Sequence, residues 1–212
     1  MMNIWSTYPT WISIGILWLF HLSAVIGIAL GYERWFIDLS PLNLSMCLGL
    51  LLLNMPVRLF PALLIPFAAG MVSEWLGVHW GWIYGSYAYG DALGWKWFEV
   101  PLVIGVNWAL LVYATYAVVY HERWPRWLRW IAGACLMVIL DVLMEQQAPQ
   151  LDYWEFVGGV VPLQNYIGWF AVGFLAHVGF DVLHKQEPPC LPFGRHLYAL
   201  FFLFFLFLNW MH

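Results

Sequence analysis

The sequence predicts an all-α fold, a polytopic membrane helical bundle of about seven transmembrane helices in a single integral membrane domain. Two observations predict it. Hydrophobic residues make up 63% of the 212 positions and charged residues 9%, whereas a soluble domain carries about 25% charged residues. Apolar runs near the length that a membrane-crossing helix needs, about 20 residues, recur along the whole chain. The hydrophilic gaps between them are too short to form a soluble domain.

Seven apolar runs are the candidate spans, at residues 11–30, 42–55, 58–76, 101–119, 128–145, 163–182 and 197–211. The first follows a short leader, residues 1–10, and has neither the basic flank nor the cleavage site of a secretory signal. The second is short for a span, so we expect it to tilt or to end early at Pro56. The third to sixth each carry an ionisable or amide side chain near one end. The seventh is apolar on every side over residues 197–208, which is typical of a helix that faces lipid.

The distribution of lysine and arginine predicts the orientation in the lipid bilayer. Cytoplasmic loops are enriched in these residues. Six of them lie in the loops on the side of the N-terminus, and two lie on the other side. We therefore expect a multi-pass protein of the cytoplasmic membrane, with its N-terminus in the cytoplasm and its C-terminus outside.

Charge and residue spacing argue against several other classes of protein. The chain carries 8 Lys and Arg against 12 Asp and Glu, a net charge of -4, so nucleic acid is a poor partner. The three cysteines form no Cys-x-x-Cys pair and the histidines show no zinc-binding spacing, so we expect neither a disulfide framework nor a metal site. The two lysines, Lys96 and Lys185, lie in loops, which disfavours a retinal Schiff base within the bundle.

Ionisable residues inside a span are costly, by roughly 2.5–3.5 kcal/mol on insertion scales, so each one is a functional candidate. Glu74 ends the third run and Glu99 starts the fourth. Asp141 and Glu145 lie near the end of the fifth run, and Asn165 lies at the start of the sixth. Because successive helices alternate in direction, we expect all five side chains at one face of the membrane.

The spacing of Asp141 and Glu145 predicts a pair of carboxyl groups that act together. Residues four apart share one face of a helix, with Cβ atoms about 5–6 Å apart. Two carboxyl groups that close in a poorly hydrated site do not both ionise readily, which leaves one of them a proton donor near neutral pH. General acid catalysis needs this arrangement, whereas the simpler alternative is a solvated acidic rim at the end of a helix.

Residues 74–101 combine many aromatic side chains with regularly spaced glycines. Glycine lets the backbone turn sharply and approach other groups closely. The rings could line a slot for a long apolar ligand and stabilise a cation over their faces by about 0.5–2 kcal/mol. An aromatic belt at the membrane interface is the simpler explanation for any single tryptophan, but the glycine spacing and the Tyr87-x-Tyr89 pair favour a slot.

A set of motifs over residues 74–170 resembles a known family. The motifs are EW-x-G at 74–77, G-x-x-YG-x-Y-x-Y at 81–89, LG at 93–94, VP at 100–101 with Trp108, D-x-x-x-E at 141–145, YW at 153–154, and VP-x-x-N-x-x-GW at 161–169. In this combination the chain resembles the carotenoid 1,2-hydratase family of bacterial and archaeal membrane proteins.

The resemblance implies hydration of the terminal carbon–carbon double bond of a linear carotenoid such as lycopene, with water as the second substrate and no cofactor. In such a reaction an acid protonates the alkene, a tertiary carbocation forms, and water captures it. Asp141 or Glu145 would then donate the proton, and Glu74 would be the base that positions the water. The residues expected to bind the substrate are Asn165, Tyr87, Tyr89, Trp169, Trp75 and Tyr84.

Two alternatives remain open at this point. In an intramembrane prenyltransferase, Asp141 and Glu145 would bind Mg²⁺ and a diphosphate, although the predicted outer face has few basic residues for the diphosphate. In a non-catalytic carotenoid or lipid carrier, the aromatic slot alone would bind the ligand. Substitution of Asp141 and Glu145 distinguishes a carrier from a hydratase. A carrier would still bind its ligand, whereas a hydratase would lose turnover.

Overall fold

The computed structural model describes residues 10–184 and 190–211. Apart from Thr10, the predicted leader lies outside the described residues, and so does Lys185. The helices are α1 (Thr10–Ala29), α2 (Glu33–Asp38), α3 (Ser40–Leu53), α4 (Phe60–Trp80), α5 (Leu102–Val119), α6 (Arg126–Glu145), α7 (Leu163–His184) and α8 (Leu191–Met211), with a short 3₁₀ turn at Val57–Leu59. The described part of the chain is thus an α-helical bundle, as predicted.

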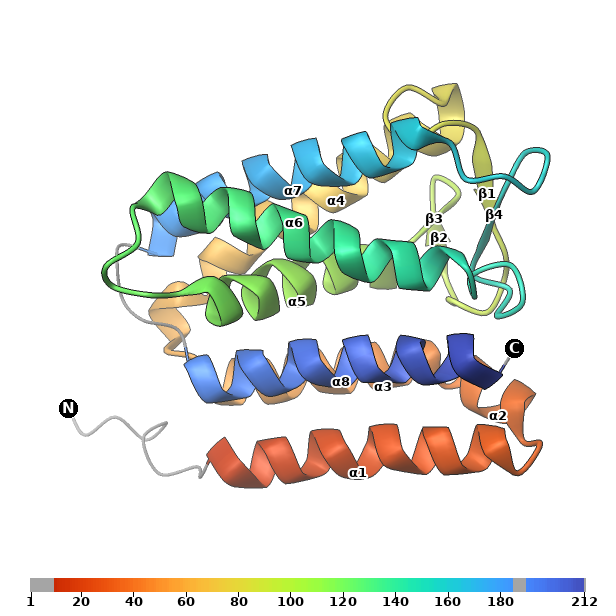
Figure 1. The fold of residues 1–212 in the computed structure, drawn as a ribbon, viewed down its shortest axis with the longest axis horizontal. Coiled ribbons are helices and arrows are strands. Elements are labelled where there is room, and N and C mark those ends of the chain that lie inside the picture. Colours follow the sequence, from red (N-terminus) through yellow and green to blue (C-terminus); the bar gives the residue numbers. More distant parts are fainter. Residues whose placement is uncertain (1–9, 185–189, 212) are drawn as a thin grey trace.

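Six of these helices are long and apolar enough to cross a membrane: α1, α4 with the turn before it, α5, α6, α7 and α8. The second predicted run forms α3, which has 14 residues and is therefore about 21 Å long, short of the 30 Å hydrocarbon layer. It ends at Asn54, whose side-chain amide donates to Ser13 Oγ at 2.6 Å and to Leu50 O at 2.7 Å. The long helices and α3 nevertheless run alternately up and down the bundle (Figure 1).

Helix α5 forms the centre of the bundle. It is apolar over most of its circumference, which is typical of a buried helix, and it packs against α3, α4, α6 and α8. Its side chains from Trp108 to Ala114 are all buried. The other long helices bury one side and leave many leucine, isoleucine and phenylalanine side chains exposed.

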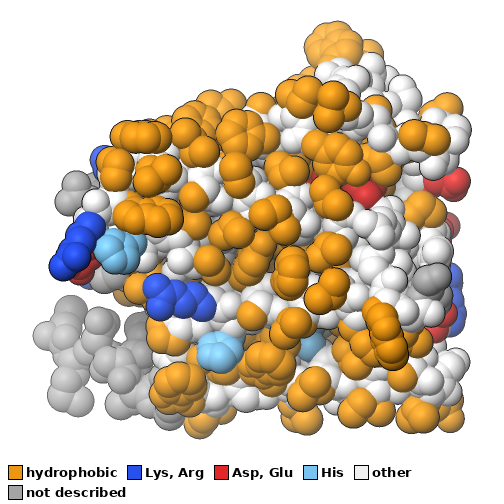
Figure 2. Space-filling model, in the orientation of Figure 1, with side chains coloured by type: hydrophobic (Ala, Val, Ile, Leu, Met, Phe, Trp, Pro, Cys, Tyr) orange, Lys and Arg blue, Asp and Glu red, His pale blue; other side chains and the backbone are white. Residues whose placement is uncertain are grey.

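Exposed hydrophobic side chains cover the flank of the bundle in Figure 2, while lysine and arginine gather mainly at the end where α8 begins. In water such a continuous apolar surface would be a strong aggregation liability. In a bilayer it is the surface that contacts lipid, which agrees with a multi-pass membrane protein.

Helices α4 and α5 approach closely at Gly70. A Cβ atom built on Gly70 would lie 2.3 Å from Cγ of Trp108, far inside van der Waals contact. Trp108 also stacks on Trp169 of α7, with ring centroids 4.6 Å apart. The absence of a side chain at Gly70 therefore leaves room for the indole of Trp108 between α4 and Trp169 of α7.

We expect Gly70→Ala to lower the thermal stability of the detergent-solubilised protein, because the added methyl group displaces a fully buried indole. Overpacking of this kind costs about 1–3 kcal/mol, and thermal unfolding followed by tryptophan fluorescence measures it. Gly49→Ala on α3 is the matched control, since no atom lies within 4 Å of the Cβ position there. This control should be neutral or slightly stabilising. Equal stability of the two variants would contradict the packing argument.

Two small antiparallel sheets cover the end of the bundle at which α4 and α6 finish (Figure 1). Strand β1 (Tyr87–Tyr89) pairs with β4 (Trp154–Phe156), with Tyr87 opposite Phe156 and Tyr89 opposite Trp154. Strands β2 (Lys96–Trp97) and β3 (Val100–Pro101) form a hairpin. The chain leaves α4 through Gly81, whose φ of 65° is the left-handed conformation that favours glycine at a helix end. Residues 74–101 thus form the final turns of α4 and this strand region.

A buried acid that was not predicted from the sequence, Asp181 of α7, lies toward the end of the bundle opposite the two sheets. Its carboxylate accepts hydrogen bonds from Tyr116 Oη at 2.6 Å, Trp130 Nε1 at 2.8 Å and Arg126 Nε at 2.7 Å. Arg126 also supplies the compensating positive charge. This cluster ties α5, α6 and α7 together and explains why an acid is tolerated inside a span.

Candidate active site

Glu74, Asp141 and Glu145 meet at the end of the bundle that the two sheets cover. Glu74 lies near the end of α4, and the other two acids occupy the last turns of α6. All three side chains are buried, with 4%, 0% and 6% of their surface exposed. Asn165 of α7 is buried beside them. The structure therefore brings together four of the five polar residues that the sequence places at one face.

The carboxyl group of Glu74 has three hydrogen-bond donors. Tyr87 Oη and Tyr89 Oη donate to its Oε2 atom at 2.5 and 2.7 Å, and Trp108 Nε1 donates to its Oε1 atom at 3.1 Å. Three donors and no acceptor are the surroundings that stabilise an ionised carboxylate. Both carboxyl oxygens of Glu74 thus have a donor inside the bundle.

The two tyrosines are neutral donors. Burial, followed by the charge of Glu74, raises the pKa of Tyr87 and the pKa of Tyr89 well above the usual value for a phenol. Each hydroxyl group therefore keeps its proton at physiological pH and directs it at Glu74.

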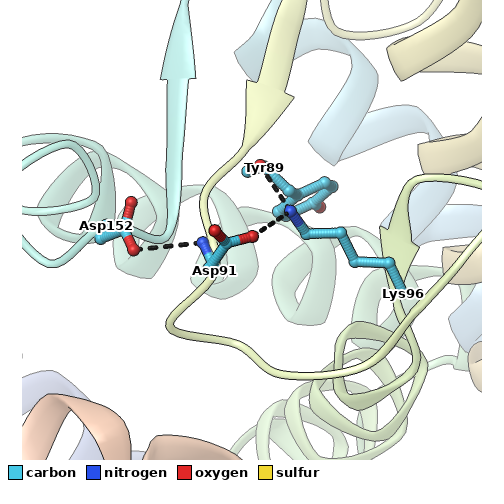
Figure 3. A network of polar contacts seen from close by, with 4 residues as sticks. All are labelled: Tyr89, Asp91, Lys96 and Asp152. Carbon is cyan, nitrogen blue, oxygen red and sulfur yellow. Dashed lines mark hydrogen bonds and ion pairs between the residues drawn. The ribbon is translucent and has the colours of Figure 1, made fainter.

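Strand β1, which carries both tyrosines, is fixed by a polar network on its outer side (Figure 3). Lys96 Nζ donates to the carbonyl oxygen of Tyr89 at 3.0 Å and pairs with Asp91 Oδ1 at 2.9 Å. The backbone N–H of Asp91 donates to Asp152 Oδ2 at 3.1 Å. The Lys96 ammonium group lowers the pKa of Asp91, through its hydrogen bond first and its charge second. The network holds the backbone of Tyr89 in place while its hydroxyl group bonds Glu74.

Asp141 and Glu145 are linked through Asn165. Its Nδ2 atom donates to Asp141 Oδ2 at 2.8 Å and to Glu145 Oε1 at 3.1 Å. The shared Asn165 donor places the two carboxyl groups beside each other, where a proton on one of them would relieve the repulsion between two negative charges. The other oxygen of Glu145 accepts from Trp154 Nε1 at 2.9 Å, whereas Asp141 Oδ1 is buried without a partner among the described residues.

A small cavity lies between Glu74 and Glu145, and Asp141 is not among its lining residues. Its volume is about 20 Å³, which is enough for a single water molecule. Its lining includes Glu74, Glu145 and Asn165, and the aromatic rings around it belong to Tyr84, Tyr87, Tyr89, Trp108, Trp154, Phe156 and Trp169. The cavity wall therefore combines two acids and two amides with aromatic rings and the aliphatic side chain of Ile104.

A much larger apolar pocket of about 490 Å³ adjoins this cavity. It is bounded mainly by α1, α2, α3, α5 and α8, with side chains such as Phe20, Trp35, Phe36, Leu44, Phe201 and Phe205. Leu19 and Phe20 of α1 also line it and are 62% and 48% exposed, so it reaches the lipid-facing surface. Ile104, Asn107 and Trp154 line both the pocket and the small cavity. A ligand in the pocket would thus have one end beside the acids.

The structure separates the other predicted site residues into two groups. Tyr84 and Trp169 line the small cavity with Tyr87 and Tyr89, and Tyr84 Oη is bonded to Ser73 Oγ at 2.8 Å. Trp75 does not line either cavity; it lies half-exposed on α4, with its ring 4.9 Å from that of Trp80. Glu99 is exposed in the turn between β2 and β3, because α5 begins three residues later than this acid.

Sequence reasoning missed the contributions of Trp108, Trp154 and Asn107. Trp108 and Trp154 belong to the motifs of the family resemblance, but their bonds to Glu74 and Glu145 depend on how α5 and β4 pack. Asn107 lies one residue before Trp108 in an apolar run, and a polar residue inside a span is itself a signal that could have identified it. Among the described residues, no group of three or more His, Cys, Asp or Glu side chains has the arrangement of a metal site.

The fold and the site together define a multi-pass membrane protein with a buried acidic cavity next to an apolar pocket. Residues 42–212 match the family described as carotenoid biosynthesis protein. The match covers most of the chain, so the chain belongs to this family.

The chain is also similar to one curated protein over part of its length. The chain is 30% identical over 118 residues to the bisanhydrobacterioruberin hydratase of Haloarcula japonica. The aligned part covers 51% of this chain and 40% of that protein, so the chain spans less than half of the relative it matches. No solved structure matches the chain.

Proposed function

We propose that the protein is a carotenoid hydratase that adds water across the terminal 1,2 double bond of a linear, lycopene-like carotenoid. The observation that carries the proposal is the junction of the two cavities, where the end of an apolar ligand would meet buried acids beside space for one water molecule. The family and the partial similarity to a named hydratase support the same chemistry.

The acid pair supplies the proton in this proposal. The protonated member of Asp141 and Glu145 transfers its proton to the less substituted alkene carbon, the π bond breaks, and a tertiary carbocation forms at the other carbon. Positioned general acids contribute about 10²–10⁴-fold to a rate. Asn165 donates a hydrogen bond to each of the two carboxyl groups, which supports its role in keeping them side by side.

The cation then lies beside aromatic faces and the negative charge of Glu74. Cation–π attraction of about 0.5–2 kcal/mol per ring and the Glu74 carboxylate stabilise it. A water molecule in the small cavity forms the new C–O bond and gives up one proton to the carboxylate that donated in the first step. That proton replaces the one donated in the first step, so the cycle needs neither cofactor nor redox partner.

The large pocket explains how a long substrate can be bound. A volume near 490 Å³ is typical of sites for ligands of drug-like size, so it takes one end of a polyene. The remainder would extend past the exposed side chains of Leu19 and Phe20 into the bilayer. We place the protein in the cytoplasmic membrane, with Arg123 of the loop between α5 and α6, and Arg126 and Arg129 at the start of α6, on the cytoplasmic side.

The test is pigment analysis of lycopene-producing cells that express the chain. We expect new products heavier than the parent carotenoid by one or two water molecules, detected by chromatography and mass spectrometry. Membranes from these cells should keep the activity in EDTA, since no step uses a divalent cation. Unchanged pigment, with the protein present in the membrane and a panel of linear carotenoids supplied, would refute the proposal; loss of activity in EDTA would favour a prenyltransferase.

A further inference from the structure

The boundary between the apolar pocket and the acidic cavity is formed by three side chains on the described part of the chain: Ile104, Asn107 and Trp154. Ile104 and Asn107 are three residues apart on α5, so they share one face of the helix. Trp154 closes the boundary from β4. Any atom that passes from the small cavity to a ligand in the pocket must cross this boundary.

Asn107 provides the unused hydrogen-bonding groups at the boundary. Ile104 is apolar, and the N–H group of Trp154 is already bonded to Glu145. No described residue forms a hydrogen bond with the Asn107 side chain. Buried or half-buried amides normally find partners, because leaving one unpaired costs about 1–3 kcal/mol. Two donors and one acceptor of Asn107 are therefore free for a ligand.

We infer that Asn107 positions the water molecule that captures the carbocation, and that it holds the hydroxyl group of the product. This inference rests on the proposed hydration. Asn107 is neither one of the three acids nor part of the motifs that carry the family resemblance. The amide oxygen accepts one O–H of the water, so that an oxygen lone pair faces the cationic carbon at the end of the pocket. The C–O bond then forms, the second proton leaves to a carboxylate, and the amide N–H donates to the new alcohol oxygen.

The consequence concerns the fate of the cation. Water capture competes with loss of a proton from a neighbouring carbon, which returns an alkene. In D₂O the acid pair delivers a deuteron, so each failed capture in which the cation loses a protium leaves deuterium in the recovered alkene. The ratio of deuterium-exchanged alkene to alcohol therefore measures water positioning separately from protonation.

The experiment compares membranes of the parent chain, Asn107→Leu and Asn107→Ser with a linear carotenoid in D₂O. We expect Asn107→Leu to raise the ratio of exchanged alkene to alcohol at least tenfold, and Asn107→Ser to restore much of the parent ratio through its hydroxyl group. Asn43→Leu is the matched control. Asn43 also lines the large pocket and has an unpartnered side-chain oxygen, but it does not line the small cavity. Its substitution should change substrate affinity and leave the ratio unchanged.

The outcomes separate this inference from the proposed function. If the parent chain forms no alcohol, the proposed hydration fails. If the parent forms alcohol and Asn107→Leu keeps the parent ratio, the hydration stands and the role of Asn107 is overturned. A parallel loss of exchange and alcohol at constant ratio, with a lower unfolding temperature, also overturns it, because that result shows a structural residue.

Discussion

The Glu145→Gln and Asp141→Asn variants are expected to lose hydration by about 10²–10⁴-fold, the contribution of a positioned general acid. Both substitutions preserve the shape of the side chain and remove the proton that the pair shares. The apolar pocket is untouched by either change, so the variants should still retain carotenoid during purification. Product formation in membranes and the pigment content of the purified protein measure the two effects separately.

Glu155→Gln is the matched control for the acid pair. Glu155 lies on β4 next to Trp154, but its side chain is exposed and lines neither cavity. The same chemical change there should leave turnover at the parent level. If Glu145→Gln and Asp141→Asn behave like Glu155→Gln, the acids are not the proton source and the carrier reading gains support.

Glu74→Gln is expected to reduce both stability and turnover. The amide oxygen of glutamine can still accept from Tyr87 and Tyr89, but its NH₂ group then faces the N–H of Trp108. Two donors cannot bond each other, so Trp108 loses its partner in a buried site. Such an unsatisfied group costs about 1–3 kcal/mol. The loss of the negative charge also removes stabilisation of the carbocation.

Two measurements distinguish these effects. Thermal unfolding in detergent reports the loss of stability, and product formation below the unfolding temperature reports the loss of turnover. Glu74→Leu leaves all three donors unpaired and should be markedly less stable than Glu74→Gln. Full activity of a folded Glu74→Gln protein would show that the charge of Glu74 has no part in the reaction.

Composition and periodicity were sufficient to predict most of the fold. Long apolar runs form helices in a bilayer because every backbone polar group must be satisfied within the segment, so the predicted ranges lie close to α1, α4, α5, α6, α7 and α8. The alternation of helices also placed the acids at one end without knowledge of their contacts. The strand pairs were not predicted, because each strand is only two or three residues long, and because β1 and β4 lie far apart in the chain.

The candidate site shows where sequence reasoning ends. Spacing alone predicts that Asp141 and Glu145 share a helix face, and the structure places them together with Asn165. Trp75 was predicted to bind the substrate because it belongs to the same motif as Glu74. Successive residues of a helix point about 100° apart, so Trp75 faces away from the cavity that Glu74 lines. Glu99 was assigned to the fourth span, whereas Pro101 precedes the first turn of α5 and leaves the acid in an exposed turn.

The sequence by itself determined that the protein is a helical membrane protein and that acids gather at one end of the bundle, since both follow from the cost of placing charge in an apolar medium. Only the tertiary structure decided which groups face those acids. The three donors to Glu74, the bridge through Asn165 and the boundary at Asn107 join elements from α4 to α7 with the strands β1 and β4. These contacts depend on how helices rotate and pack against one another, and packing is set by complementary shapes across the whole bundle rather than by any local pattern.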